Sequence, residues 1–93
     1  MRRFMAATVR GYEYAIAHPE ESVEILLRAS PETDPGLARR SQAWLSPRYQ
    51  DDAARWGEQN LEVWQEFAEF MFDNQLIETP IDPQKAFTND FLP

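Results

Sequence analysis

Residues 56–76 form the most aromatic and most regularly patterned stretch of the chain, and any fold has to accommodate them. Their apolar side chains recur every three or four positions, which is the spacing of one face of an amphipathic helix: Val63, Trp64, Phe67, Phe70 and Met71. Asn60 precedes this run and is suited to cap its first turn. The pattern predicts a helix from Leu61 to about Asn74, where asparagine tolerates the left-handed conformation of a helix end. Its wide apolar face needs neighbours on more than one side.

Prolines divide the preceding chain into three further predicted helices. Residues 3–17 form the first, which ends at His18-Pro19 because the residue before proline is disfavoured in the α region. Pro19 opens the second helix, which closes at Ser30-Pro31. Asp34-Pro35 opens the third, which runs to about Leu45. The chain thus contains about four amphipathic helices.

Each of these helices has residues that we expect to face a core. They are Met5, Val9, Tyr12 and Ile16 in the first helix, Val23, Leu26 and Leu27 in the second, and Leu37, Ser41, Trp44 and Leu45 in the third. Gly11 lies in the middle of a predicted helix, where glycine is unfavourable. Its presence predicts close contact of the backbone with another helix.

Two segments lack a sustained period. Residues 48–59 are predicted to be an ordered loop, pinned by Tyr49 and Trp56. Residues 76–93 are predicted to be extended, with one helical turn opened by Asp82-Pro83 and a tail anchored by three apolar residues, Phe87, Phe91 and Leu92. No strand-like alternation is present, so the predicted fold class is all-α, as a single helical domain over residues 1–93.

The charge distribution restricts the classes of partner. Residues 1–45 hold six basic and six acidic side chains, whereas residues 46–93 hold three basic and ten acidic ones. A nucleic-acid or anionic membrane surface would need a cationic face, so neither partner is expected. No apolar run is long enough for membrane insertion. The absence of cysteine excludes thiolate metal sites and disulfides.

The side chains suited to catalysis or metal binding are few and scattered. His18 is the single histidine, and its position at a helix junction favours a capping or exposed role. Asp51-Asp52 has no second acidic cluster to meet, and the acidic row from Glu62 to Asp73 is typical of a solvated helix face. We therefore predict no enzymatic activity, no cofactor and no metal site.

Aromatic residues around the predicted loop leave two interpretations open. Tyr49, Trp56 and Trp64, with Arg48 adjacent, could form a stacking pocket for a flat heterocycle. Alternatively, the rings fix the loop to the helix that begins at Leu61. The ligand-binding candidates are accordingly Arg48, Tyr49 and Trp56.

Three stretches resemble the C-terminal region of one family: GYEYAIAHPEESVEILL, WLSPRYQDDAARWGEQNLEVWQEFAEFM and PIDPQKAFTNDFLP. The family comprises the substrate-binding proteins of ABC importers for thiamine pyrimidine precursors, which are related to the sulfonate, taurine and nitrate binding proteins. The resemblance covers nearly the whole chain. Its most specific parts are residues 14–19, Tyr49 with Trp56-Gly57, Trp64 with Phe67-Ala68, and residues 86–93.

The resemblance implies a longer, two-lobed α/β protein of the type 2 periplasmic-binding-protein kind, in which these helices cover one lobe. The expected partners are the missing N-terminal lobes or a second copy of the chain in a homo-oligomer, with a pyrimidine ligand only in the full protein. A full binding protein of this family would be periplasmic or lipid-anchored outside the cell. The chain as it stands, without a signal peptide, is expected in the cytoplasm. A stand-alone helical interaction or dimerisation module is the alternative function.

Overall fold

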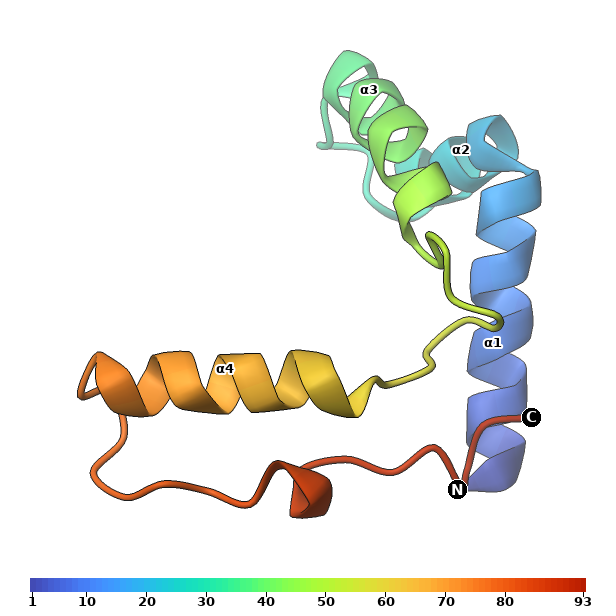
Figure 1. Ribbon diagram of the computed structural model, residues 1–93. Coiled ribbons are helices and arrows are strands. Elements are labelled where there is room, and N and C mark those ends of the chain that lie inside the picture. Colours follow the sequence, from blue (N-terminus) through green and yellow to red (C-terminus); the bar gives the residue numbers. More distant parts are fainter. The chain divides into compact units, whose positions relative to one another are not determined.

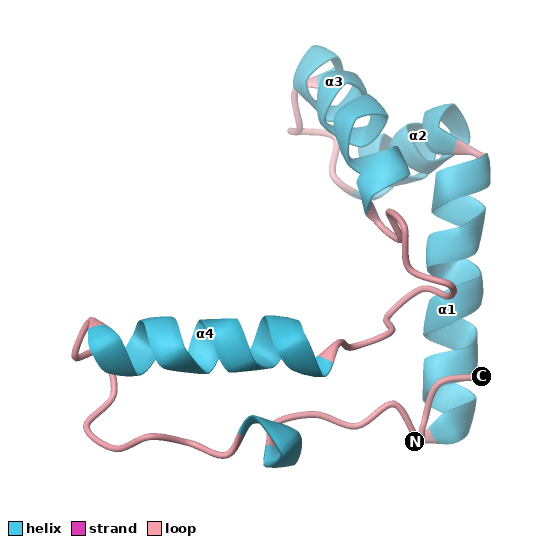
Figure 2. Ribbon diagram, viewed as in Figure 1, coloured by secondary structure: helices cyan, strands magenta, loops and turns pink.

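A computed structural model describes residues 1–93 and contains helices and loops with no strand (Figures 1 and 2). This confirms the all-α prediction. The helices are α1 (Arg2–Ala17), α2 (Pro19–Ala29), α3 (Pro35–Leu45) and α4 (Leu61–Asp73), with the 3-10 turns η1 (Ser46–Arg48) and η2 (Pro83–Lys85). Two compact units are present, the N-terminal unit (Met1–Gly57 with Pro93) and the C-terminal unit (Glu58–Leu92). The single domain expected over residues 1–93 stays a prediction, and each unit is described by itself.

Two of the helices, α3 and α4, begin at the residues that the capping rules select. Asp34 accepts a hydrogen bond from the backbone N–H of Leu37 at 2.6 Å, and Pro35 follows as the first helical residue. Asn60 accepts from the backbone N–H of Glu62 at 2.8 Å. Local capping therefore determines where α3 and α4 start, and the predicted starts are confirmed.

The end of α4 differs from the prediction by one residue. Asn74 has φ −89° and ψ 11°, so the left-handed residue is Gln75, with φ 57°. The N–H of Gln75 donates to the carbonyl of Phe72 at 3.0 Å, and the N–H of Leu76 donates to that of Met71 at 2.9 Å. This pair of bonds is the Schellman motif, in which the left-handed residue follows the cap. Asn74 stays outside the left-handed region and donates its side-chain amide to the Phe70 carbonyl at 2.8 Å.

In the N-terminal unit, α2 packs beside α3 (Figure 1). The buried apolar residues of this unit are Val9, Val23 and Ala38. The predicted inward positions Leu26, Leu37 and Trp44 are wrong, because 46%, 59% and 60% of these residues are exposed. The small side chain of Ala38 lies in the core in place of Leu37, and three short helices cover only a narrow stripe of one another.

Gly11 does not mark a close helix contact. A Cβ atom added there would meet no other atom within 4 Å, apart from its own helix backbone and chain neighbours. The predicted close approach at this glycine is therefore wrong for this structure.

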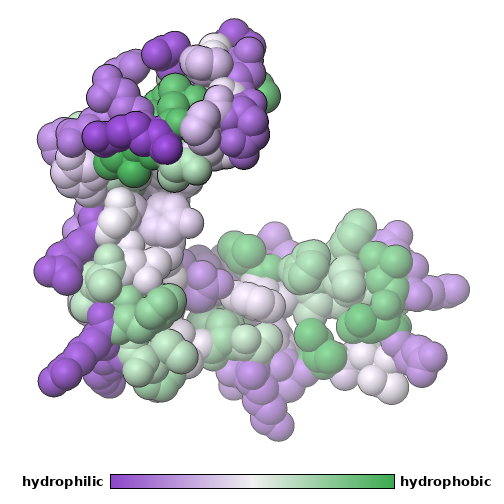
Figure 3. All heavy atoms as spheres, turned by 180° about the vertical axis from the view of Figure 1, so that it is seen from behind, coloured by the Kyte–Doolittle hydropathy of each residue, from purple (hydrophilic) through white to green (hydrophobic).

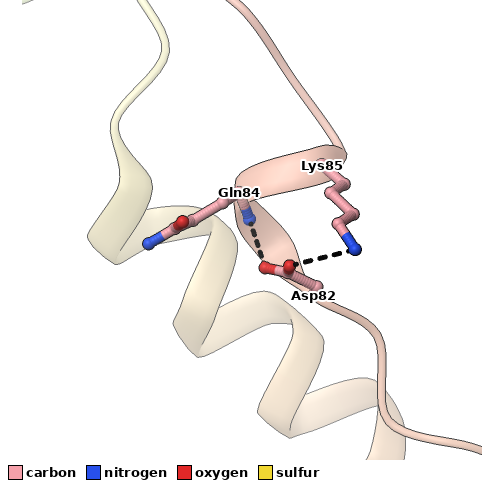
Figure 4. A network of polar contacts seen from close by, with 3 residues as sticks. All are labelled: Asp82, Gln84 and Lys85. Atoms are coloured by element: carbon pink, nitrogen blue, oxygen red, sulfur yellow. Dashed lines mark hydrogen bonds and ion pairs between the residues drawn. The ribbon is translucent and has the colours of Figure 1, made fainter.

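The C-terminal unit is built from α4 and the chain that follows it. η2 lies against α4, and the Phe87 ring stacks on the Trp64 indole with centroids 5.8 Å apart. Asp82 opens η2 by accepting from the backbone N–H of Gln84 at 3.1 Å, and its second carboxylate oxygen lies 3.7 Å from the Lys85 ammonium (Figure 4). The predicted last helical turn is thus confirmed.

Much apolar surface is left uncovered in both units, and no large side chain is fully buried. In the C-terminal unit Ala68 and Leu92 are buried, but the predicted tail anchor Phe91 is exposed. The apolar face predicted for α4 is only partly covered, since Trp64 and Met71 are half-buried whereas Val63, Phe67 and Phe70 are exposed. Figure 3 shows hydrophobic side chains on the surface over α4 and the tail.

Candidate functional site

Three aromatic rings meet on α1 in the N-terminal unit. The Tyr12 ring stacks on the Trp56 indole with centroids 4.1 Å apart and planes at 19°. The edge of the Tyr49 ring meets Tyr12 at 5.3 Å and 80°. The sequence singled out Tyr49 and Trp56, and the structure brings them together through Tyr12, which helical spacing had assigned to the core stripe. Tyr49 and Trp56 thus fix their part of the loop to α1.

A hydrogen-bond network holds Tyr49 in place. Its hydroxyl donates to the Gln42 side-chain oxygen at 3.2 Å. The Gln42 amide in turn donates to the Ala15 carbonyl of α1 at 3.3 Å and to the Ser46 hydroxyl at 3.1 Å. Through these bonds Gln42 of α3 ties η1 to both α1 and α3. Ser46 is buried, so its hydroxyl is satisfied inside the protein. The sequence signal for Gln42 was weak, since a glutamine on a helix usually faces solvent.

The other two residues of the predicted stacking set make different contacts. The Arg48 guanidinium lies 3.9 Å from the centroid of the Trp44 ring, and its Nη1 donates to the Trp44 carbonyl at 2.5 Å. Trp64 belongs to the C-terminal unit, where its indole N–H donates to the Gln59 side-chain oxygen at 2.9 Å. The Trp64 ring also stacks on the Phe87 ring. Of the predicted ligand-binding residues, Tyr49 and Trp56 are therefore the two that lie in one aromatic cluster, on the Tyr12 ring.

Trp56 also lines an open cavity of about 700 Å³ on α1. Its other lining residues are Arg3, Ala6, Val9, Arg10, Glu13, Arg55 and Pro93. Among these residues Val9 is buried and Ala6 is half-buried, whereas Arg3 and Arg10 are exposed. The Arg55 Nη1 donates to the Pro93 carbonyl at 3.0 Å. An indole wall with cationic donors around it can hold a flat ring that carries hydrogen-bond acceptors.

The groups with shifted pKa values lie outside this cavity. A hydrogen bond from the Tyr14 hydroxyl to the Glu21 carboxylate raises the pKa of the phenol. A hydrogen bond from the Ser30 hydroxyl lowers the pKa of the Glu32 carboxyl. Both ionisable groups are exposed. His18 lies against the Tyr14 ring at 4.4 Å, between α1 and α2.

No three or more histidine or acidic side chains converge in a way that could hold a metal ion. No helix combines the length and the apolar character needed to cross a bilayer.

The comparisons with known proteins point to a flavin-binding relative. No family model matches the sequence. The chain is similar to the riboflavin-binding protein RibY of Chloroflexus aurantiacus, with 32% identity over 99 aligned positions. The alignment takes in 100% of the chain and 28% of the relative, so the chain spans little more than a quarter of that protein's length.

This relative corrects the ligand inferred from the family resemblance. It is named for riboflavin, so the predicted thiamine pyrimidine-precursor family, and the thiamine biosynthesis role with it, are wrong. The resemblance misled for a physical reason. Its motifs include residues that end helices or pack against other residues, such as His18-Pro19 and Trp64, and such residues indicate the fold but not the ligand. The alternative of a stand-alone helical module gains no support from this relative. The relative is named as a binding protein, and the absence of enzymatic activity in this chain stays a prediction.

Proposed function

We propose that this chain is part of a non-enzymatic protein that binds riboflavin or a close flavin derivative. The observation that carries the proposal is the 32% identity to a riboflavin-binding protein along 100% of the chain. Since the chain corresponds to 28% of that relative, it would supply one part of the binding protein.

The chemistry of the cavity beside Trp56 supports a flavin as ligand. The isoalloxazine of riboflavin is a flat, tricyclic ring system with an apolar edge and an edge that carries carbonyl oxygens. Trp56, already held on one face by Tyr12, offers a rigid aromatic wall for such a ring. Arg3 and Arg10 line the cavity and can donate to the carbonyl edge, and Ala6 and Val9 give the lining apolar surface. The cavity volume of about 700 Å³ lies in the range of small-molecule sites.

The decisive experiment replaces the aligned segment of RibY with this chain and titrates the chimera with riboflavin. Flavin fluorescence is quenched when the ring stacks on an aromatic side chain, so saturable quenching is the expected result. A chimera that is helical and melts cooperatively, yet does not quench riboflavin at any concentration, would overturn the proposal.

A matched pair of variants tests the placement of the ligand beside Trp56. In the chimera, Trp56→Ala should weaken riboflavin binding about tenfold, because loss of one aromatic stacking partner costs about 1.5 kcal/mol. Trp44→Ala is the control, since Trp44 is an exposed indole on α3 that does not line the cavity. Equal riboflavin affinities of the two variants would show that the ligand does not bind beside Trp56.

A further inference from the structure

The surface of α4 divides into three faces of different character. One face packs within the C-terminal unit, where the tail residues Pro80, Ile81 and Pro83 line a cavity with Ala68. A second face is acidic and consists of four side chains: Glu62, Glu66, Glu69 and Asp73. The third is an apolar stripe of Val63, Phe67 and Phe70, whose spacings of four and three residues place them on one side of the helix.

The apolar stripe is open to solvent along its length. The exposed fractions are 61% for Val63, 54% for Phe67 and 55% for Phe70. Isolated exposed apolar residues are common, but two phenylalanines and a valine in one row form a contiguous patch. A patch of this kind is typical of a surface that packs against another polypeptide.

The charge of the C-terminal unit indicates which charge a polypeptide that covers the stripe should carry. Residues 58–92 hold eight acidic side chains and one basic one, a net charge of −7, whereas the N-terminal unit is formally neutral. Two copies joined stripe to stripe would bring two acidic rows and two such charges together, which opposes association. A surface that is apolar at its centre and neutral or basic at its rim fits the stripe better.

We infer that this stripe is a docking face for the part of a RibY-like polypeptide that the chain does not span. The inference rests on the proposed function for the identity of that polypeptide. It also rests on length, because 72% of the relative lies outside the aligned segment and can supply the covering surface. The stripe on α4 would then become an internal packing surface of the longer protein.

Cysteine accessibility tests this directly, because the chain contains no cysteine of its own. Val63→Cys is introduced into the isolated 93-residue chain and into the RibY chimera, and maleimide labelling of position 63 is followed by peptide mass spectrometry. We expect labelling at least about 100-fold slower in the chimera, because protection scales with the fraction of time the site is open. Glu62→Cys on the acidic face is the matched control, because Glu62 is exposed, and it should react at similar rates in both proteins.

Each other outcome has a defined meaning. Equal labelling of position 63 in both proteins overturns the docking face, as does a chimera that fails to fold where RibY itself folds. Protection in the isolated chain at tens of micromolar concentration, with a dimeric mass by light scattering, assigns the stripe to a second copy and also overturns the inference. A chimera that protects position 63 but does not bind riboflavin supports the docking face while the proposed function fails.

Discussion

The ring of Tyr12 lies nearly parallel to the indole of Trp56, with centroids 4.1 Å apart, and this contact joins the loop after η1 to α1. Trp56 is half-buried and Tyr12 is 37% exposed, so the stack lies at the surface of the N-terminal unit. Tyr49 meets the same Tyr12 ring edge-on. Tyr12 is thus the residue on which both aromatic residues of the loop converge.

Replacing Tyr12 should show how much this convergence stabilises the unit. Tyr12→Ala should lower the free energy of unfolding by about 1–2 kcal/mol, less than for a fully buried aromatic because the ring is partly exposed. Tyr12→Phe keeps the ring and should stay within about 0.5 kcal/mol of the parent chain. Urea denaturation followed by tryptophan fluorescence measures both, and equal losses for the two variants would contradict a role for stacking.

Gly11→Ala should stabilise the isolated chain by about 1 kcal/mol. Glycine in a helix interior costs about that much relative to alanine, because more backbone freedom is lost on folding. An added Cβ would meet no atom within 4 Å beyond the helix backbone and chain neighbours, so no steric cost opposes the gain. Thermal melting by circular dichroism is the measurement, with Gly36→Ala as a contrasting variant, since a Cβ there would lie 3.3 Å from both the Arg40 and Asp34 side chains. A lower melting temperature for Gly11→Ala would show that the space is filled.

Glu32 should contribute to stability in a pH-dependent way. The hydrogen bond from Ser30 lowers the pKa of the Glu32 carboxyl in the folded chain below its ordinary value of 4.5. A group whose folded pKa is depressed contributes stability above its unfolded pKa, and that contribution is lost as the pH falls through the folded pKa. Titration by NMR should find the lowered pKa, and Ser30→Ala should bring it back toward 4.5. An unchanged pKa in Ser30→Ala would assign the shift to another group.

Helix boundaries were predictable from the sequence because local chemistry determines them. Asp34 and Asn60 cap their helices with their own side chains, and Pro19 and Pro35 occupy first turns. These effects operate within a few residues and need no tertiary context. The all-α class followed for the same reason.

Burial was less predictable because it depends on what covers each face. Periodicity identified an apolar side for α3 and α4 but could not say that Leu37 and Phe67 would be left more than half exposed. The role of Tyr12 was missed in the same way, since a stripe residue was not expected to receive two rings from a distant loop. The ligand was mispredicted because scaffold motifs are shared by binders of different molecules.

Gln75→Gly should stabilise the chain by about 1 kcal/mol. Gln75 holds the left-handed position of the Schellman motif that ends α4, with φ 57°, and a residue with a Cβ pays about 1–2 kcal/mol for that conformation. Glycine adopts it without that cost, although part of the gain is offset by greater freedom of the unfolded chain. Asn74→Gly is the matched control, because Asn74 has φ −89° and donates to the Phe70 carbonyl, so glycine there should destabilise. Chemical denaturation of the two variants decides the matter, and a stabilising Asn74→Gly with a destabilising Gln75→Gly would place the left-handed residue at position 74 after all.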